Sequence, residues 1–280
     1  MRACPLALLR DLLPILTLTT DFGLDDAYLG AVKGAILSVA PDCRLVDISH
    51  GIAAQDVMGA AFVLRGAVPY FPPGTVHLAV VDPGVGTERR AIATQIGGHT
   101  FVGPDNGMFS LLLDGRDLFA SEATVVLDRP AFWRTPTPSP TFHGRDLFAP
   151  VAAHLAAGRT LTEVGTPTDE IKQLHWVQPL ADEQGVRGWI VHIDRFGNAV
   201  TNIPGKLLTA SADGRDLKCY VGSAILDRVC RTYGDVDEGE PVMLVGSSGL
   251  LEISVNSGDA AQLLSIQKGS AVSIVFAERA

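Results

Sequence analysis

The most constraining feature of the sequence is the alternation of two hydrophobic periods between residues 15 and 157. Apolar, β-branched runs of strand length occur at 15–20, 44–49 and 76–81, and segments with small and apolar side chains at helical spacing lie between them at 27–39 and 55–68. Strands that alternate with helices favour an α/β domain with a mostly parallel sheet that is covered on both faces.

The pattern changes in the C-terminal third of the chain. Short segments of alternating hydrophobicity, separated by Gly, Asp and Asn and with hardly any helical period, occur at 188–193, 217–221, 241–245, 251–255 and 271–276. This pattern is typical of a small antiparallel β barrel. We therefore expect four parts, which are an N-terminal extension (1–14), an α/β domain (15–158), a linker (159–185) and a β-barrel domain (186–280).

Charge and cysteine content disfavour several classes of function. The 280 residues include 22 Lys and Arg against 31 Asp and Glu, a formal net charge of −9, which disfavours binding to nucleic acid or to an anionic membrane surface. The four cysteines form no CxxC pair, so neither a zinc site nor a disulfide scaffold is indicated. Arg10, Asp11 and Pro14 interrupt the apolar N-terminal stretch, which fits neither a signal peptide nor a membrane span. We expect a cytoplasmic protein without a metal site.

The first polar cluster follows the first predicted strand, at the edge of an open sheet where ligands commonly bind. Asp21 ends this strand, and its carboxylate can accept hydrogen bonds from a ribose diol or hold a cation. The neighbouring Asp25 and Asp26 are interpreted as caps of the following helix.

Two further clusters carry groups suited to acid–base chemistry. In VDPGVGTERR, Asp82 follows a buried strand and Arg89 can fold back toward it; the alternative is a tight turn with solvated arginines. His143 follows a proline-rich loop at 129–140 and supplies a group that titrates near neutral pH. The other histidines, His50 and His77 among them, are interpreted as packing or surface groups.

The β-barrel domain carries a cluster that suits a nucleoside and an amino acid. Asp194, Phe196 and Asn198 follow a predicted strand and offer a carboxylate for an ammonium group, an aromatic face for a purine and an amide for its edge. The loop 246–249, which contains Ser247, offers hydroxyls and backbone amides for a carboxylate. The alternative for both segments is an ordinary hairpin turn.

Six motifs in order carry a resemblance to a known family: DFGLDDAY, VVDPGVGTERRAI, PDNG, FHGRD, DRFGNAVTNI and GSSGLLEISVN. Together they resemble the S-adenosylmethionine (SAM) hydroxide adenosyltransferases, which are relatives of the fluorinases and chlorinases. The resemblance runs from about Ile15 to the C-terminus. It implies an N-terminal α/β domain and a C-terminal β barrel, assembled as a homotrimer.

The resemblance also implies a role for each matched residue. The family's water-activating Asp, Arg and His fall on Asp82, Arg89 and His143. The implied substrate contacts are Asp21 for the ribose, Phe196 and Asn198 for the adenine, Asp194 for the methionine ammonium, Ser247 for its carboxylate, and the segment with Glu252, Val255 and Asn256 as lining of the adenine pocket. The implied site lies between the N-terminal domain of one subunit and the C-terminal domain of the next, and it needs no cofactor.

The implied reaction is hydrolysis of SAM to adenosine and methionine by attack of water on the ribose C5′. The halogenating relatives resemble a version with an aromatic residue in place of Asp82, Tyr and Ser in place of His143 and Gly144, and an insertion before PDNG where this chain has only Gly97 and Gly98. A carboxylate at position 82 repels a halide, which disfavours a SAM-dependent halogenase.

Two alternatives belong to other classes of protein. TDFGLDDA resembles the DxDPGxDDA signature of calcium-dependent nucleoside N-ribohydrolases, but Thr19 stands at the first aspartate and Phe22 replaces the proline. A non-catalytic protein that binds adenosine or SAM is the other alternative, and turnover distinguishes it from an enzyme.

Overall fold

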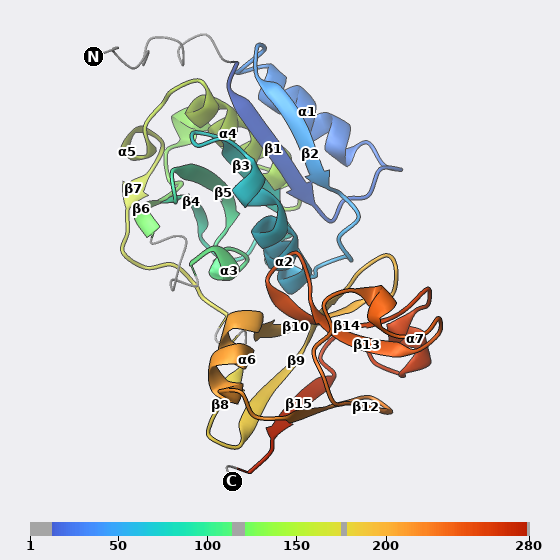
Figure 1. Cartoon of the computed structure of the whole chain (residues 1–280). Helices are drawn as coiled ribbons and strands as arrows, with labels where there is room; N and C mark the ends of the chain where they lie inside the picture. Colours follow the sequence, from blue (N-terminus) through green and yellow to red (C-terminus); the bar gives the residue numbers. More distant parts are fainter. Residues whose placement is uncertain (1–12, 114–120, 175–177, 279–280) are drawn as a thin grey trace, which may run out of the picture. The chain divides into compact units, whose positions relative to one another are not determined.

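A seven-stranded sheet organises the N-terminal part of the chain in the computed structural model, which describes residues 13–113, 121–174 and 178–278 (Figure 1). The strand order is β2-β1-β3-β5-β4-β6-β7. The strands are β1 (Ile15–Thr20), β2 (Arg44–Ser49), β3 (Val76–Val80), β4 (Ala91–Ile96), β5 (His99–Pro104), β6 (Ser121–Val126) and β7 (Thr166–Pro167).

The sheet is mixed. The pairings of β1 with β2, β1 with β3 and β3 with β5 are parallel, whereas β4 pairs antiparallel with β5 and β6, and β6 pairs antiparallel with β7. The α/β class is therefore confirmed, with the parallel strands in the half of the sheet that begins at β2.

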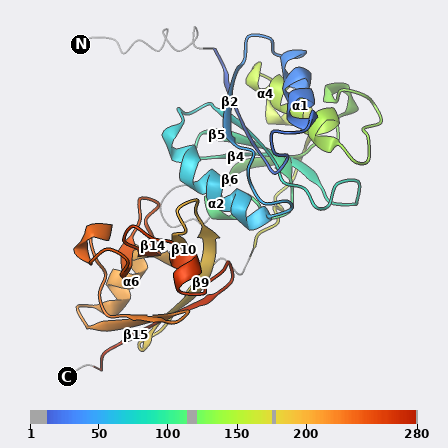
Figure 2. The same cartoon turned by 90° about the vertical axis from the view of Figure 1, so that its right-hand side faces the viewer.

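Helices cover both faces of this sheet (Figures 1 and 2). Helices α1 (Tyr28–Leu37) and α4 (Ala149–Ala156) pack with Leu78 and Val80 in one apolar cluster. Helices α2 (Val57–Ala67) and α3 (Ser110–Leu113) pack with Ala79 and Val81 in a second cluster. Because successive side chains of a strand point to opposite faces, the fully buried strand β3 and the adjacent Val81 supply both layers.

The stretch expected to be a linker contains regular structure. Helix α5 (Leu161–Val164) lies in it, and β7 pairs with β6 at the edge of the sheet. Of the expected N-terminal extension, residues 1–12 lie outside the described part of the chain.

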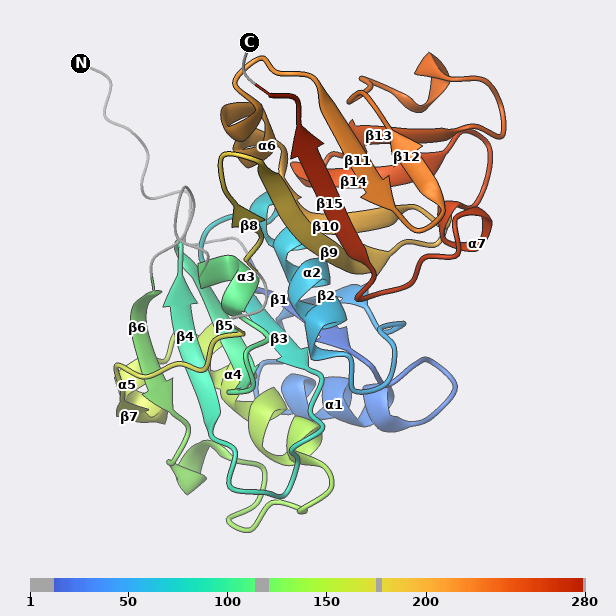
Figure 3. The same ribbon diagram turned by 90° about the horizontal axis from the view of Figure 1, so that it is seen from below.

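The C-terminal part forms an antiparallel, barrel-like sheet of eight strands (Figure 3). Its main order is β12-β11-β15-β9-β10-β14-β13, and β8 pairs with β9. The two edges of the sheet come close together. The backbone N–H of Cys230, in the connection after β12, donates to the Met243 carbonyl of β13 at 2.7 Å, so the sheet nearly closes. The strands are β8 (Leu180–Ala181), β9 (Gly185–Ile193), β10 (Ala199–Pro204), β11 (Leu217–Val221), β12 (Ala224–Leu226), β13 (Pro241–Val245), β14 (Leu250–Val255) and β15 (Ala271–Phe276). The prediction of a C-terminal antiparallel barrel is confirmed.

Several strands and helices of the C-terminal unit could not be predicted from alternating hydrophobicity. Strand β10 is buried along both faces, and its polar members are satisfied internally: Thr201 Oγ1 donates to the Leu251 carbonyl at 2.8 Å, and Asn202 Oδ1 accepts from Trp189 N–H at 2.9 Å. Helix α6 (Gly205–Ala212) is short and contains Gly, Ser and Thr, which are weak helix formers. A four-residue helix, α7 (Ala260–Leu263), is capped by Asp259.

The chain divides into two units, Met1–Leu174 and His175–Ala280, and each has a core of its own. None of the helices in the described residues is long and apolar enough to cross a membrane.

Candidate active site

Arg89 joins the three side chains that the sequence analysis singled out in the N-terminal unit. Its Nε donates to Asp82 Oδ1 at 2.8 Å and its Nη2 donates to Asp82 Oδ2, while Nη2 also lies 3.1 Å from His143 Nδ1. The side chains of Asp82 and Arg89 are only 6% and 11% exposed. The guanidinium carbon lies 5.0 Å from the centre of the Phe148 ring, which supports it from another side.

The contact with Arg89 determines the tautomer of His143. A guanidinium can only donate hydrogen bonds, so Nδ1 of His143 accepts and a neutral imidazole carries its proton on Nε2. Burial lowers the pKa of His143, the charge of Arg89 lowers it further, and the carboxylates of Asp82 and Asp146 act in the opposite direction. At neutral pH the cluster thus holds a carboxylate, a guanidinium and a neutral imidazole with one N–H donor to offer.

The turn that carries Asp82 and Arg89 packs tightly against the proline-rich loop. Gly86 has a φ of +75°, and a Cβ at this position would lie 2.3 Å from the carbonyl oxygen of Pro140. Only glycine fits both the left-handed backbone and the close approach. The two loops are therefore interlocked at Gly86 as well as through Arg89 and His143.

Asp146 anchors the proline-rich loop. Its side chain is 1% exposed and accepts from Arg134 Nε at 2.6 Å, from Arg145 Nε at 2.7 Å and from the Ser139 backbone N–H at 3.0 Å. These bonds, with that of Arg145 making the largest contribution, hold the pKa of Asp146 well below the usual carboxyl range. Residues Gly144–Phe148 form one π-helical turn before α4, and His143 stands at its start.

Asp21 lies on a different loop of the same unit. Its Oδ2 accepts a hydrogen bond from the Gln55 backbone N–H at 2.8 Å. The prediction that Asp25 and Asp26 cap the following helix is wrong, because Ala27 occupies the N-cap of α1 and no side chain bonds to the end of that helix. Residues 24–27 instead form turns before the helix, which removes both carboxylates from the capping position.

In the C-terminal unit, Asp194 organises the turn that the DRFGN motif forms. Its Oδ1 accepts from the backbone N–H groups of Phe196 and Asn198 at 2.8 and 3.0 Å, and its Oδ2 accepts from Asn198 Nδ2 at 3.0 Å. The turn buries Asn198, but the Phe196 ring is 76% exposed. The structure thus brings these three predicted residues together and presents an aromatic face to the surroundings.

A second group in this unit centres on Glu252. The carboxylate is buried in β14 and accepts from the Tyr233 hydroxyl at 2.8 Å and from Ser254 Oγ at 2.9 Å. Burial, Glu252 and Asp194 raise the pKa of Tyr233 to about 12. Tyr233 belongs to none of the predicted clusters; its signal in the sequence is that it is the aromatic residue in the acidic connection 227–240.

The remaining predicted residues lie at the two ends of β14, with Ser247 before the strand and Val255 and Asn256 at its C-terminal end. Asn256 Nδ2 donates to the Val236 carbonyl at 2.9 Å, which ties β14 to the same connection as Tyr233. Val255 is buried in the strand, and Ser247 is exposed in the turn between β13 and β14.

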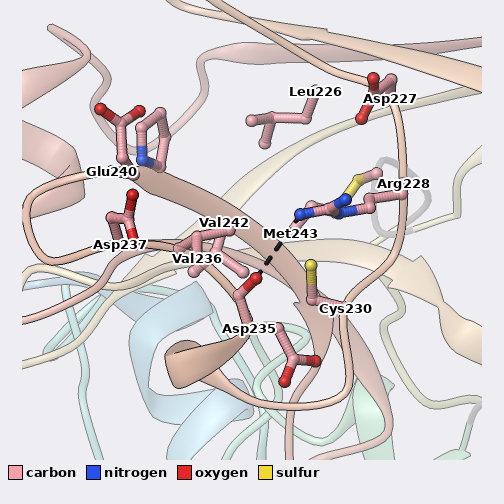
Figure 4. A pocket seen from close by; sticks show the side chains of 11 residues that line it. Leu226, Asp227, Arg228, Cys230, Asp235, Val236, Asp237, Glu240, Val242 and Met243 are labelled. Atoms are coloured by element: carbon pink, nitrogen blue, oxygen red, sulfur yellow. Dashed lines mark hydrogen bonds between the residues drawn. The ribbon is translucent and has the colours of Figure 1, made fainter.

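A separate cavity of about 500 Å³ opens in the C-terminal unit beside β13 (Figure 4). Its lining combines four carboxylates and the guanidinium of Arg228 with apolar side chains; the carboxylates are those of Asp227, Asp235, Asp237 and Glu240. None of the predicted binding residues lines this cavity. Within 13–113, 121–174 and 178–278, no group of three or more His, Cys, Asp or Glu side chains is arranged to hold a metal ion.

Family models match both units of the chain. The model for the SAM hydroxide adenosyltransferase N-terminal domain matches residues 16–165, and that for the C-terminal domain matches residues 188–273. The chain belongs to the SAM hydroxide adenosyltransferase family. The family expected from the six motifs is therefore confirmed.

Several relatives of the chain bear names that state an activity. The (R)-S-adenosyl-L-methionine hydrolase of Thermus thermophilus is 43% identical, covering 91% of this chain and 97% of the relative. That of Methanocaldococcus jannaschii is 34% identical, covering 95% and 97%. A fluorinase from Actinoplanes sp. is more distant, at 28% identity with 94% and 98% covered. The crystal structure of an uncharacterized conserved protein from Thermotoga maritima is similar in fold, with a TM-score of 0.85, 37% identity and coverage of 93% and 99%.

Proposed function

We propose that the protein is an enzyme that hydrolyses S-adenosyl-L-methionine to adenosine and L-methionine. The observation that carries the proposal is the cluster of Asp82, Arg89 and His143, whose hydrogen bonds place a carboxylate and an imidazole around one guanidinium. Relatives that are 34–43% identical over most of the chain bear the name of this activity. The chain keeps a carboxylate at position 82, which disfavours the halide chemistry of the more distant fluorinases.

The substrate itself makes the leaving group easy to expel. As the water oxygen bonds to C5′, the C5′–S bond breaks and its electron pair stays on sulfur, which changes from a sulfonium to a neutral thioether. No acid is needed on that side. The enzyme has to hold one water molecule in line with the C5′–S bond, at a distance of about 3–3.5 Å, and to exclude others.

We assign a separate role in the reaction to each of the three side chains. Nδ1 of His143 is engaged by Arg89, so we assign its Nε2–H to donate to the attacking oxygen and orient it. Asp82 accepts the water proton through a lone pair that Arg89 does not use. Because an oxygen that has just formed a third bond is strongly acidic, even a carboxylate held by an arginine can take this proton. Arg89 holds Asp82 and His143 in place for this step through its hydrogen bonds to both side chains.

The other predicted residues are assigned to binding. Asp21 holds the ribose hydroxyls, Phe196 stacks on the adenine and Asn198 contacts its edge. The residues that we assign to the rest of the pocket are Asp194 for the ammonium group, Ser247 for the carboxylate, and Glu252, Val255 and Asn256 for the adenine lining. We propose no cofactor.

We further propose that the protein is a cytoplasmic homotrimer, in which the N-terminal unit of one subunit and the C-terminal unit of the next complete each site. The ring of Phe196, which is 76% exposed, fits this proposal because it leaves an aromatic face open at the surface of its unit. Cys43, Cys219 and Cys230 are free thiols, which fits a reducing compartment.

The configuration of the substrate at sulfur is part of the proposal. A sulfonium with three different carbon substituents is a stereocentre, and the hydrolase relatives are named for the (R) form. We propose that the (R) epimer is hydrolysed in preference to the (S) epimer, which assays on the two separated epimers would show.

The deciding experiment is turnover of SAM in ¹⁸O-labelled water. Label in the 5′-hydroxyl of adenosine is the expected result and establishes attack at C5′. Absence of turnover, label elsewhere, or product formation that depends on chloride or fluoride refutes the proposal.

Substitutions in the cluster test the assigned roles. We expect Asp82→Ala and His143→Ala to bind adenosine with the affinity of the original protein and to lose turnover by about 10²- to 10⁴-fold, the range of general acid–base effects. Glu88→Ala is the matched control, because Glu88 is an exposed carboxylate in the same turn.

A further inference from the structure

The segment that carries Asp21 is bonded to one buried histidine, His50, which follows β2. Thr20, the fully buried last residue of β1, places its Oγ1 2.8 Å from Nδ1 of His50. The Phe22 backbone N–H donates to the same hydroxyl at 3.3 Å, and the Gly23 backbone N–H donates to the His50 carbonyl at 2.9 Å. Three residues that flank Asp21 are therefore linked to His50. Thr20 and Gly23 bond to it directly, and Phe22 is linked to it through the Thr20 hydroxyl.

The same connection also holds the carboxylate of Asp21. Gln55, five positions beyond His50, donates its backbone N–H to Asp21 Oδ2 at 2.8 Å from a left-handed conformation with φ of +65°. A non-glycine residue adopts this conformation only where its surroundings fix it. Backbone and side chain of Asp21 thus depend on the stretch between β2 and α2.

The two ring nitrogens of His50 have different polar neighbours, Thr20 at Nδ1 and Asp47 at Nε2. Nε2 of His50 lies 3.2 Å from Asp47 Oδ1, but without the alignment of a hydrogen bond. Asp47 in turn accepts from Lys33 Nζ of α1 at 2.7 Å. Of the two contacts, the shorter one is between Nδ1 and the Thr20 hydroxyl, and it is the one that links the ring to the segment of Asp21.

We propose that His50, acting through the hydroxyl of Thr20, is a positioning residue that holds Asp21 for binding of the ribose. This rests on the proposed function, in which Asp21 contacts the ribose. None of the bonds described for His50, Thr20 or Gln55 involves Asp82, Arg89 or His143. Loss of the His50–Thr20 bond should weaken substrate binding and leave the chemical step nearly unchanged.

The experiment compares KM and kcat for SAM, and the dissociation constant for adenosine, in paired variants of the full chain. His50→Ala and Thr20→Val should raise KM and the adenosine dissociation constant about 3- to 10-fold, the range expected for one hydrogen bond, with kcat within about twofold. His50→Asn places an amide near the position of Nδ1 and should restore binding. His50→Gln places its amide near Nε2 and should not.

Thr19→Val is the matched control for Thr20→Val. Thr19 is the preceding residue of β1 and is equally buried, but its hydroxyl has no hydrogen-bond partner within the described residues. Its removal should leave KM and kcat unchanged. A double variant, His50→Ala with Asp21→Asn, should bind adenosine as weakly as Asp21→Asn alone, because His50 acts only through Asp21.

The outcomes separate this inference from the proposed function. If the original protein turns SAM over but His50→Ala and Thr20→Val keep its KM, or lose kcat in place of KM, the positioning role is refuted. If the original protein binds adenosine without turning SAM over, the proposed function fails, and the adenosine affinities still decide the role of His50. If it binds neither, both are refuted. If His50→Ala does not fold, the comparison of KM and adenosine affinity between Thr20→Val and Thr19→Val decides the question.

Discussion

The buried imidazole of His77 should make the stability of the protein fall steeply below pH 6.5. His77 lies in β3 and is fully buried, with Nδ1 2.7 Å from Thr17 Oγ1, Nε2 3.2 Å from His99 Nδ1, and its ring stacked on Phe101. Burial, and secondarily the neighbouring His99, lower the pKa of His77 to about 3. The site therefore accepts a proton far less readily in the folded protein than in the unfolded chain.

The sign and size of the effect follow from proton linkage. With an unfolded pKa of about 6.5, His77 binds more protons in the unfolded state between pH 6.5 and 3, so stability is retained above this window and is lost as pH falls through it. At pH 5, proton binding to His77 lowers the free energy of the unfolded state by 1.36 × log(1 + 10^1.5), or about 2 kcal/mol. This value hardly depends on the folded pKa as long as that pKa lies below about 4.

The assay is urea unfolding at pH 7 and pH 5 of the original protein and of His77→Asn. Asparagine keeps a polar group near the position of Nδ1 but does not titrate in this range. We expect the original protein to lose about 2 kcal/mol more than the variant between the two pH values. Equal losses in the two proteins would refute the linkage, and an imidazole NMR titration of His77 with a midpoint near 6.5 in the folded state would refute its cause.

Three shorter predictions concern the loops and the absence of a metal requirement. Gly86→Ala should lower the unfolding free energy by more than Gly74→Ala, whose left-handed position has open space and should cost only about 1–2 kcal/mol; equal losses would show that the contact with Pro140 is unimportant. Asp146→Asn should lower stability by about 1–3 kcal/mol in thermal unfolding and reduce turnover without weakening adenosine binding, because it loosens the loop before His143. Excess chelator should leave SAM turnover unchanged; activity that is lost and then restored by calcium would favour a nucleoside N-ribohydrolase.

The sequence was most informative where one periodicity or one motif determines the structure. The apolar run of β3 and the helical spacing after β1 predict their elements because local pattern and burial agree there. Asp82, Arg89 and His143 were selected by chemistry and by resemblance, and the structure brings them into contact.

Other features depend on contacts that a local pattern does not contain. Strand β10 is buried on both faces, so it shows no alternation. Tyr233 joins a network through its bond to Glu252, and the role proposed for His50 depends on its contact with Thr20, which lies 30 positions away in the sequence. That Asp25 and Asp26 do not cap α1 reflects the path of the turns before the helix.

The interlocking of the 82–89 turn with the proline-rich loop has a consequence for how such a protein can change its nucleophile. The backbone of Gly86 rests on Pro140, and Arg89 bridges Asp82 to His143, so neither loop can be remodelled while the other keeps its shape. An aromatic residue in place of Asp82 alone would leave Arg89 without the carboxylate that it bonds to. Arg89 would then no longer be held in place beside His143. A switch from water to halide in this scaffold therefore requires matched replacements on both loops at once.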